Sequence, residues 1–441
     1  MVVSRGPTSK YLGPLEKMYR KYRYVCICAL VVFGVAAHGG VEDWARAVFE
    51  TGAGLLFLAW ALWIYFTKEE QVVFSPLLPP LVAFSLIVCG QWFFHGTASS
   101  YGTRMELLLL VSDLIVLFVA VQVFRTLEDW RGFVWFGMFF GFLVSLFAIL
   151  QHLTSNGKLY WFREISSGVL PFGPYVNRNH FAGFAELILP LALAPLVLGR
   201  VRRERRPVVG LFAVLPIGAL FLSASRGGIL SFGVELGALA LVMIHRRTMG
   251  KQWLAGVAVL LVALLLVSWL GVGQILERLS SVQLLEVTAG KRASMRKDTW
   301  RIFLDHPFVG TGLGTLQIVY PSYETLYDGK IVNHTHNDYL EALAETGILG
   351  GLCCAWFLGV LFNKSLKRLR QLNYSFAGTL QLSGLVASAG FLMHSFVDFN
   401  LHIPANALLF FLMAHLATAE IPQSSPSASP SKRRHRNSGN P

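Results

Sequence analysis

Charged residues are scarce in this chain of 441 residues, of which only 14% are Asp, Glu, Lys or Arg while 54% are hydrophobic. A typical soluble globular domain carries about 25% charged residues, so the composition excludes that class. Long apolar runs recur from residue 24 to residue 419, as expected of a polytopic membrane protein. The first run follows a polar, basic segment of more than twenty residues, so we expect no cleavable signal peptide.

Cysteine is also rare, and each of the five cysteines lies within an apolar run. A thiol buried in such a run behaves as a small hydrophobic side chain. The spacing therefore indicates neither a disulfide framework nor a zinc knuckle. The five residues are Cys26, Cys28, Cys89, Cys353 and Cys354.

The apolar runs predict an all-α integral membrane protein with about twelve transmembrane helices. They lie at 24–40, 46–66, 72–95, 105–125, 133–153, 180–199, 207–224, 226–245, 252–272, 338–363, 376–397 and 400–419. An even number of crossings places both ends of the chain on the same side. From the first apolar run to the last, the membrane domain is expected to span 24–419.

Acidic residues are fewer than basic ones, 25 against 38, which gives a formal charge of +13. Most of the basic residues fall on the N-terminal side of the predicted topology, so the positive-inside rule makes that side cytoplasmic. We interpret the excess as topology and lipid headgroup contact, and expect membrane lipids but no nucleic acid as partners. Residues 1–23 are then a cytoplasmic basic segment and 420–441, rich in Ser and Pro, a disordered cytoplasmic tail.

The largest outer segment is a periplasmic loop at about 273–337, between the ninth and tenth helices. Within it, residues 293–305 mix Trp300 and Phe303 with basic side chains, which predicts an amphipathic helix at the level of the headgroups. Pro307 and the glycines after it are expected to end that helix. The glycine run lacks the Lys-Ser/Thr of a nucleotide phosphate loop.

Ionisable side chains gather where this loop meets the tenth helix, in the stretch 333–347. At a membrane boundary such groups mark a functional site by default. We predict that His336 acts as a general base, because imidazole titrates near neutral pH. The candidates to orient His336 or tune its pKa are His334, Asn337, Asp338 and Glu345.

Two other interpretations of this stretch remain open. One is a metal site made by His334, His336 and a carboxylate, although a His-x-His pair without further spaced ligands is weak support and we predict no metal. The other is a histidine with only a structural role at the interface. His180, His394 and His402 are interpreted as packing or hydrogen-bonding residues.

Three arginines lie on the same outer face as the histidines: Arg178, Arg226 and Arg296. A planar guanidinium suits phosphate oxygens, and an arginine at a membrane boundary needs an anionic partner. We predict that the three converge on a phosphate or diphosphate. The alternative is contact with phospholipid or ion pairing with Glu186, Glu235 or Asp398.

Together these groups indicate a reaction class. An enzyme on the outer face of a bacterial cytoplasmic membrane has no nucleotide sugars, so a transferase there needs a donor with its own activated leaving group. A lipid-linked diphosphate sugar meets this need: the arginines neutralise the departing diphosphate while the base activates an acceptor hydroxyl.

The same residues resemble the O-antigen ligase and polymerase superfamily. His336-Asn337, nine further residues and Gly347-Ile348-Leu349-Gly350 are similar to the ligase signature His-Asn-x9-Gly-x-x-Gly, although Gly351-Leu352 stand where ligases have Thr-Thr. Other similar segments run from Tyr175 to Gly183, from Ser225 to Gly228, from Arg296 to Trp300 and from Pro307 to Gly314, so the resemblance covers about 170–360.

The resemblance implies a metal-independent, inverting glycosyl transfer that uses no cofactor. It also implies that His336 is the catalytic residue and that Arg226 and Arg296 contact the donor diphosphate, while Arg178 is added from its position alone. The leading hypothesis is therefore an O-antigen-ligase-type enzyme of the bacterial inner membrane, with its active site facing the periplasm. Its donor would be a glycan on undecaprenyl diphosphate, and its acceptor lipid A-core.

Several alternatives are kept. The acceptor is a second lipid-linked repeat in a polymerase, which the missing Thr-Thr favours, or a protein hydroxyl in an oligosaccharyltransferase. A transporter or flippase would need charged residues near mid-membrane in two related halves, and no such repeat is evident. A non-catalytic scaffold would explain the topology but not His336 beside the outer arginines.

Overall fold

The computed structural model describes residues 14–67, 71–165, 170–245, 253–280, 282–327, 329–371 and 375–421. These residues form helices and connecting turns, with no β-strand among them. The helices are α1 Pro14–Ala36, α2 Asp43–Thr67, α3 Leu78–Phe93, α4 Ser100–Val123, α5 Leu127–Leu153, α6 Arg178–Val197, α7 Arg206–Leu222, α8 Arg226–His245, α9 Trp253–Ser280, α10 Val282–Asp305, α11 Leu316–Val319, α12 Asp338–Gln371, α13 Phe376–His394 and α14 Pro404–Thr418, with short 3-10 turns η1 Arg203–Arg205, η2 Tyr320–Ser322 and η3 Asn400–His402. The predicted tail lies outside the described residues beyond 421, as does the start of the N-terminal segment.

The prediction of an all-α, multi-pass membrane protein is confirmed, but the count of twelve crossings is confirmed only in part. All twelve predicted runs form a helix, and nine helices of the described chain are long and apolar enough to cross a membrane: α2, α4, α5, α6, α7, α8, α9, α12 and α13. The helices α3 and α14 have 16 and 15 residues. At about 1.5 Å per residue each is shorter than a hydrocarbon core of about 30 Å.

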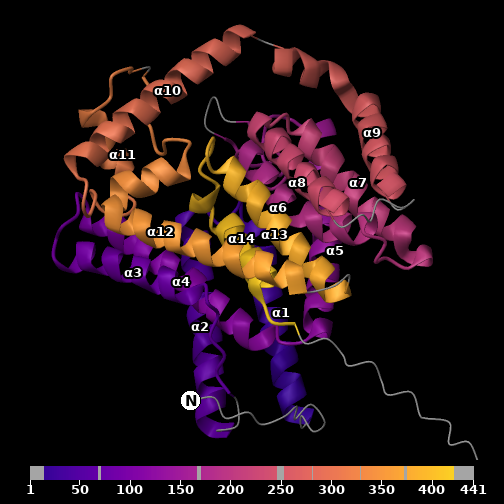
Figure 1. The fold of residues 1–441 in the computed structure, drawn as a ribbon. Helices are drawn as coiled ribbons and strands as arrows, with labels where there is room; N and C mark the ends of the chain where they lie inside the picture. Colours follow the sequence, from indigo (N-terminus) through magenta and orange to yellow (C-terminus); the bar gives the residue numbers. More distant parts are fainter. Residues whose placement is uncertain are drawn as a thin grey trace, which may run out of the picture.

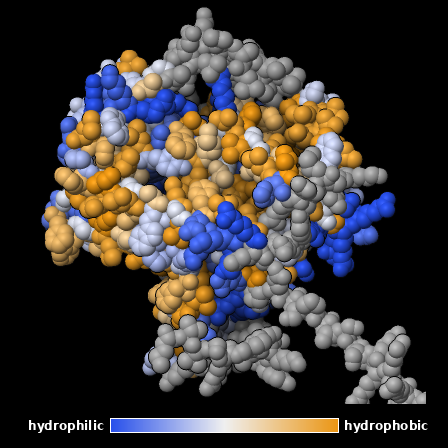
Figure 2. Space-filling view, viewed as in Figure 1, coloured by the Kyte–Doolittle hydropathy of each residue, from blue (hydrophilic) through white to orange (hydrophobic). Residues whose placement is uncertain are grey.

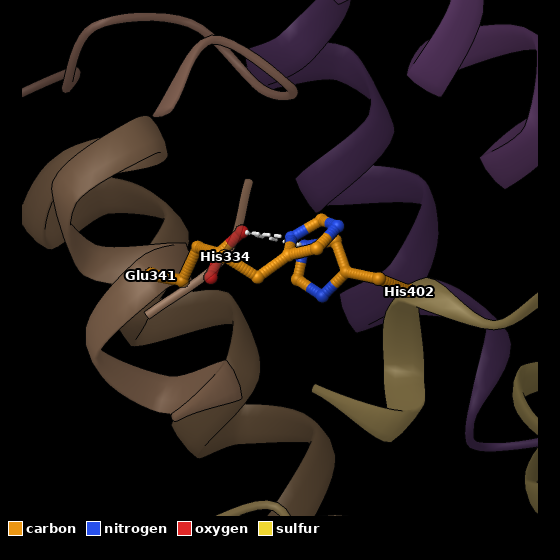
Figure 3. A group of neighbouring side chains, drawn as sticks. All are labelled: His334, Glu341 and His402. Atoms are coloured by element: carbon orange, nitrogen blue, oxygen red, sulfur yellow. Dashed lines mark hydrogen bonds and ion pairs between the residues drawn. The ribbon is translucent and has the colours of Figure 1, made fainter. Parts of the chain in front are cut away.

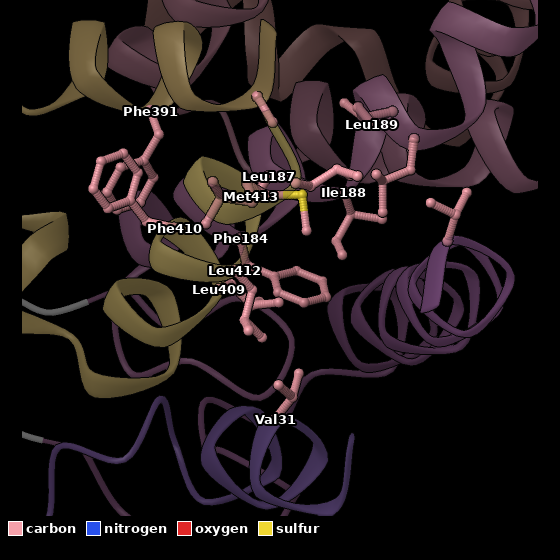
Figure 4. Packing of buried hydrophobic residues seen from close by; sticks show 14 of the residues in the cluster. Val31, Phe184, Leu187, Ile188, Leu189, Phe391, Leu409, Phe410, Leu412 and Met413 are labelled. Atoms are coloured by element: carbon pink, nitrogen blue, oxygen red, sulfur yellow. The ribbon is translucent and has the colours of Figure 1, made fainter. Parts of the chain in front are cut away.

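The helices α6, α13 and α14 form the centre of the bundle (Figure 1). Nearly every residue of the three is buried, and their side chains interdigitate with those of the surrounding helices. Phe184 of α6 packs near Met413 of α14, and the rings of Phe391 and Phe410 stack at 5.2 Å (Figure 4). Polar groups at the ends of these three helices are therefore held by a rigid core.

The outer helices keep apolar side chains on their exposed faces. Hydrophobic residues cover much of the visible surface in Figure 2, and on α9 both Leu265 and Trp269 stay exposed. Such a surface is unfavourable in water and suits the hydrocarbon of a bilayer, where the helices satisfy their own backbone groups.

Much of the predicted outer loop is itself helical. The helix α9 continues to Ser280 and α10 follows it, so that the two form an arch over the bundle (Figure 1). The amphipathic helix predicted over 293–305 is the second half of α10, and it ends two residues before Pro307, as predicted. Met295 and Ile302 of α10 pack with Leu316, Tyr320, Val332 and Ala344, which fixes the arch on α12.

The helix α12 is broken at Gly347, where the glycine run after α10 packs against it. Gly347 has φ 63° and ψ −165°, a conformation outside the helical range. Across the break, the N–H of Ile348 donates to the carbonyl oxygen of Pro307 at 2.8 Å. A Cβ on Gly310 would lie 2.2 Å from the carbonyl carbon of Glu345, so only glycine permits this backbone approach.

Gly347→Ala is expected to lower the melting temperature of the detergent-solubilised protein markedly. A Cβ there would lie 2.3 Å from the carbonyl oxygen of Phe308, and φ is positive, so a cost of about 2 kcal/mol or more is expected. Gly359→Ala is the matched control, because a Cβ at Gly359 of α12 meets nothing within 4 Å and should be neutral or stabilising. Equal melting temperatures for the two variants would contradict the role of the break.

Candidate functional site

His336 lies in the turn that enters α12, and a buried carboxylate holds its ring. Its φ is 53°, a left-handed conformation that is uncommon for a non-glycine residue and concentrates at functional sites. Nδ1 lies 3.0 Å from Oδ1 of Asp398, in the segment between α13 and η3. Since the ring is held through Nδ1, Nε2 is the nitrogen available for proton transfer, as in a base oriented by a carboxylate.

Asp398 is suited to this role because it stays ionised although only 1% of it is exposed. Burial alone would raise the pKa of Asp398, but the hydrogen bond with His336 and the charges of neighbouring imidazoles hold that pKa below its usual range. The backbone N–H of Phe399 donates to the same Oδ1 at 3.0 Å. A fixed anion at this point favours the ring tautomer with its proton on Nδ1.

A cavity of ≈ 260 Å³ adjoins this pair, and Asp398 forms part of its wall. Its cationic lining comes from three helices: Arg178 begins α6, Arg226 begins α8, and Arg292 lies on α10. The remaining lining residues are Asn179, Ala224, Gly227, Leu230, His394 and Val397. Three guanidiniums against one carboxylate make the cavity suitable for an anion with several oxygens.

Two of these arginines are the first residues of their helices, and helix capping fixes where each helix begins. The Asn177 side chain accepts a hydrogen bond from Asn179 N at 2.9 Å and so begins α6, while Ser225 Oγ accepts from Gly228 N at 3.2 Å and so begins α8. Both helices therefore have their N-terminal ends at the cavity. The positive ends of the two helix dipoles add to the attraction for an anion.

The structure brings together Arg178 and Arg226 as predicted, but the third arginine at the cavity is Arg292. Its Nη1 donates to the carbonyl oxygen of Val397 at 3.1 Å, which ties α10 to the segment that carries Asp398. Arg296 lies one turn further along α10 and is not among the lining residues of the cavity. The sequence contains a signal for this alternative, because positions four apart share a helix face.

A second, partly buried network is formed by His334, Glu341 and His402 (Figure 3). His334 Nδ1 lies 2.6 Å from Oε1 of Glu341, and His402 Nε2 lies 3.4 Å from the same oxygen. On its other side, His402 Nδ1 lies 2.9 Å from Oδ1 of Asp338. Burial alone would lower the pKa of His402, but the carboxylates of Glu341 and Asp338 outweigh it and raise that pKa to about 10. A charged His402 therefore joins α12 to η3.

The three side chains of this network could hold a metal ion, since one donor atom from each lies within 4.8 Å of the others. The contacts between them can also be explained without an ion. Both ring nitrogens of His402 face carboxylates, and the second oxygen of Glu341 accepts from Thr335 N at 2.9 Å. This hydrogen bonding fits a charged imidazole between two anions.

His402→Gln is expected to destabilise the protein by about 3 kcal/mol near neutral pH, because it leaves the buried carboxylate of Asp338 without its imidazole partner and that of Glu341 with His334 alone. The folded pKa lies above the unfolded value of about 6.5. The stabilisation is therefore fully present below about pH 6.5 and lost as the pH rises through about 10. The difference in melting temperature between wild type and His402→Gln should narrow from about pH 7 to above pH 10. A difference that stays constant would contradict the assignment, and the exposed His306→Gln is the control.

Of the four residues predicted to support His336, three shape the turn around it and Glu345 holds the glycine segment after α10. Asn337 Oδ1 accepts from Leu340 N at 3.0 Å and begins α12, while Asp338 and His334 belong to the second network. Glu345 accepts from the backbone N–H groups of Gly314 and Leu316, at 2.9 and 2.8 Å. Among the described contacts, the side chain that accepts a hydrogen bond from the His336 ring is instead Asp398.

Sequence reasoning named Asp398 only as a possible arginine partner, because 62 positions separate it from His336. The signal that could have found it is the polar stretch His394 to Asn400, which lies between two apolar runs on the predicted outer side. Two polar stretches at the same membrane boundary are candidates for one site.

The fold and site describe a multi-pass membrane protein with an arginine-lined cavity beside a carboxylate-held imidazole. Residues 211–355 match the family model described as O-antigen ligase, a region that contains Arg226, Arg292 and His336. The predicted resemblance to the O-antigen ligase superfamily is thereby confirmed.

A relative is the teichuronic acid biosynthesis protein TuaE of Bacillus subtilis (strain 168), which is 24% identical over 333 residues. The match covers 69% of this chain and 66% of TuaE, just under two thirds of that relative.

Proposed function

We propose that the protein is a glycosyltransferase of polysaccharide biosynthesis in the bacterial inner membrane. It transfers a glycan from undecaprenyl diphosphate to an acceptor hydroxyl on the periplasmic face, in the manner of an O-antigen ligase with lipid A-core as acceptor. The observation that carries the proposal is the position of Asp398, which lines the arginine cavity and holds His336 at 3.0 Å. The carboxylate of Asp398 thus connects the arginine cavity, where an anion would bind, to the proposed base His336.

The chemistry follows from this arrangement. The diphosphate of the donor occupies the cavity, where Arg178, Arg226 and Arg292 offset the charge that grows on it as its bond to the sugar breaks. Nε2 of His336 takes the proton of the acceptor hydroxyl while the hydroxyl oxygen attacks the anomeric carbon. Attack on the face opposite the departing diphosphate inverts the configuration at that carbon.

The topology supports a periplasmic site. The basic clusters between helices, including Arg200 to Arg206 before α7, fall on the side opposite the N-terminal ends of α6 and α8. By the positive-inside rule, the clusters are cytoplasmic and the cavity lies at the periplasmic boundary. Apolar surface between the helices is available to the polyprenyl tail.

A polymerase is the second candidate, with another lipid-linked repeat as its acceptor. It is favoured by Gly351-Leu352 in place of Thr-Thr. The site chemistry would be the same, because only the source of the attacking hydroxyl differs. A protein hydroxyl would make the enzyme an oligosaccharyltransferase.

The deciding experiment is a gene deletion complemented with wild type or with His336→Ala, followed by electrophoresis of lipopolysaccharide and of undecaprenyl-linked glycan. For a ligase, the lipopolysaccharide ladder disappears while long lipid-linked polymer accumulates. For a polymerase, single-repeat material remains and long chains disappear. Unchanged pools of both kinds would contradict both assignments and direct attention to a protein acceptor.

Metal removal is expected to leave transfer unchanged, because arginines supply the positive charge at the cavity. The measurement is the rate of the purified protein before and after dialysis against millimolar EDTA. A loss of activity that added Zn²⁺ restores would contradict the expectation and would assign an ion to the second network, at His334, Glu341 and His402.

A further inference from the structure

A second imidazole–carboxylate pair lies at the same cavity. His394 ends α13 with its side chain 1% exposed, and its Nδ1 lies 2.9 Å from Oε1 of Glu186, on α6. Glu186 is itself 0% exposed. His394 is a lining residue of the arginine cavity, and within the described residues its buried Nε2 has no hydrogen-bond partner.

Gly227, in the first turn of α8, packs directly against this edge of the ring. A Cβ at Gly227 would lie 2.6 Å from Nε2 of His394, so any other residue would cover that edge of the ring. Arg226, which precedes Gly227, lines the same cavity. An anion bound between the arginines would therefore lie beside the ring of His394.

A carboxylate such as Glu186, buried within a membrane-spanning helix, needs a partner that offsets its loss of solvation. Glu186 follows Arg178 by eight residues on α6, which places the two Cα atoms about 12 Å apart along the helix. An ionised carboxylate buried there is costly unless it is paired, and its described partner is His394. The pair is held within the rigid centre of the bundle, since α6 and α13 pack along each other (Figure 1).

The two pairs occupy complementary positions for a glycosyl transfer. Asp398 and His394 are four residues apart, and both line the cavity. His336, held by Asp398, is placed for the acceptor. A transfer of this kind gains from a second group that donates to the departing oxygen, in addition to the base.

Resting on the proposed glycosyl transfer, we propose that His394 donates a hydrogen bond from Nε2 to the departing diphosphate, with Glu186 as its positioning residue. The acceptor oxygen forms its bond to the anomeric carbon, and the acceptor proton goes to Nε2 of His336. The bond from the anomeric carbon to the diphosphate oxygen breaks and leaves its electron pair on that oxygen. His394 acts as the doubly protonated imidazolium: its Nδ1–H donates to the Glu186 carboxylate, its Nε2–H stabilises this new charge, and both protons stay on the ring.

The test varies the basicity of the leaving group. The host's undecaprenyl-linked repeating unit is prepared with its diphosphate intact, with a methylene bridge between the two phosphorus atoms, and with a difluoromethylene bridge. The methylene analogue leaves as a more basic anion than the difluoromethylene analogue. Rates are measured with the full-length protein in nanodiscs at saturating donor and acceptor.

His394→Gln is expected to lower kcat for the natural donor about 100-fold with little change in KM. The rate ratio of the difluoromethylene to the methylene analogue should rise about tenfold, because the variant no longer shields the departing charge. Glu186→Gln, which keeps the shape of the side chain, should give an intermediate ratio. The matched control is His415→Gln: His415 is a buried histidine of α14 outside the cavity lining, and its variant should keep the wild-type ratio.

A wild-type ratio in His394→Gln would overturn the inference, since a residue with only a structural role would slow all three donors equally. A wild-type ratio in Glu186→Gln would likewise remove Glu186 from its positioning role. These outcomes are distinct from failure of the proposed function, in which the wild-type protein transfers from none of the three donors and both proposals fall.

Discussion

His336→Ala lowers kcat for glycan transfer about 1,000-fold, within the usual contribution of a positioned general base. The expectation rests on the ring that Asp398 fixes at 3.0 Å, with Nε2 available for the acceptor proton. The substitution removes an edge contact with the ring of Phe399, at 5.0 Å between centroids, but the His336 side chain is 24% exposed and lies outside the apolar core. Binding of the donor should therefore persist, and the measurement is single-turnover transfer by purified protein with saturating donor.

Two further variants sharpen this prediction. Asp398→Asn keeps the size of the side chain but removes the fixed charge, so a loss of about 100-fold or more is expected. His306→Ala, at an exposed histidine after α10, should leave the rate unchanged. Full activity of His336→Ala would mean that the turn into α12 has no catalytic role, and would favour a scaffold.

Arg226→Ala lowers kcat/KM for the donor by about 100- to 1,000-fold, the range seen when one preorganised donor to a developing anion is lost. Arg226 is expected to contact the diphosphate before as well as during the reaction, so the KM for the donor rises too. Inorganic diphosphate, which mimics the leaving group, should inhibit the wild-type protein competitively and inhibit this variant far more weakly.

The two arginines of α10 provide an internal comparison. Arg292→Ala should approach the effect of Arg226→Ala, because Arg292 lines the cavity. Arg296→Ala, one turn away, should lower kcat/KM less. The reverse order would restore Arg296 to the role that the family resemblance assigns to it and would place the diphosphate further along α10.

The helices were predictable because their apolar runs depend on local composition alone. Hydropathy located all twelve helices in the bundle, but it could not show that α3 and α14 are too short to span a bilayer unaided. The sequence also predicted too little helix in the arch formed by α9 and α10. The first half of α10 mixes polar and apolar residues without a clear stripe, so only its second half was predicted as helix.

The site was predictable where it depends on sequence neighbours and unpredictable where it depends on tertiary contact. The sequence placed His336, Arg178 and Arg226 at one membrane boundary because each lies at a helix end. The pairing of His336 with Asp398 joins segments 62 positions apart, and no periodicity specifies it. Choosing Arg292 over Arg296 requires the rotation of α10 about its axis, which only its contacts define.

The break at Gly347 divides the signature His-Asn-x9-Gly-x-x-Gly into a histidine half, His336-Asn337, and a glycine half, Gly347 to Gly350. The two halves are under different physical constraints. The histidine half is constrained by proton transfer, so substitutions there should leave a protein that accumulates normally but does not turn over. The glycine half is constrained by the space between two backbones, since a Cβ on Gly347 would lie 2.3 Å from the carbonyl oxygen of Phe308. Substitutions there should reduce the amount of protein in the membrane, while the molecules that do fold remain active. Substitutions within this one motif should therefore have two different effects: those in its histidine half lower turnover, and those in its glycine half lower the amount of folded protein.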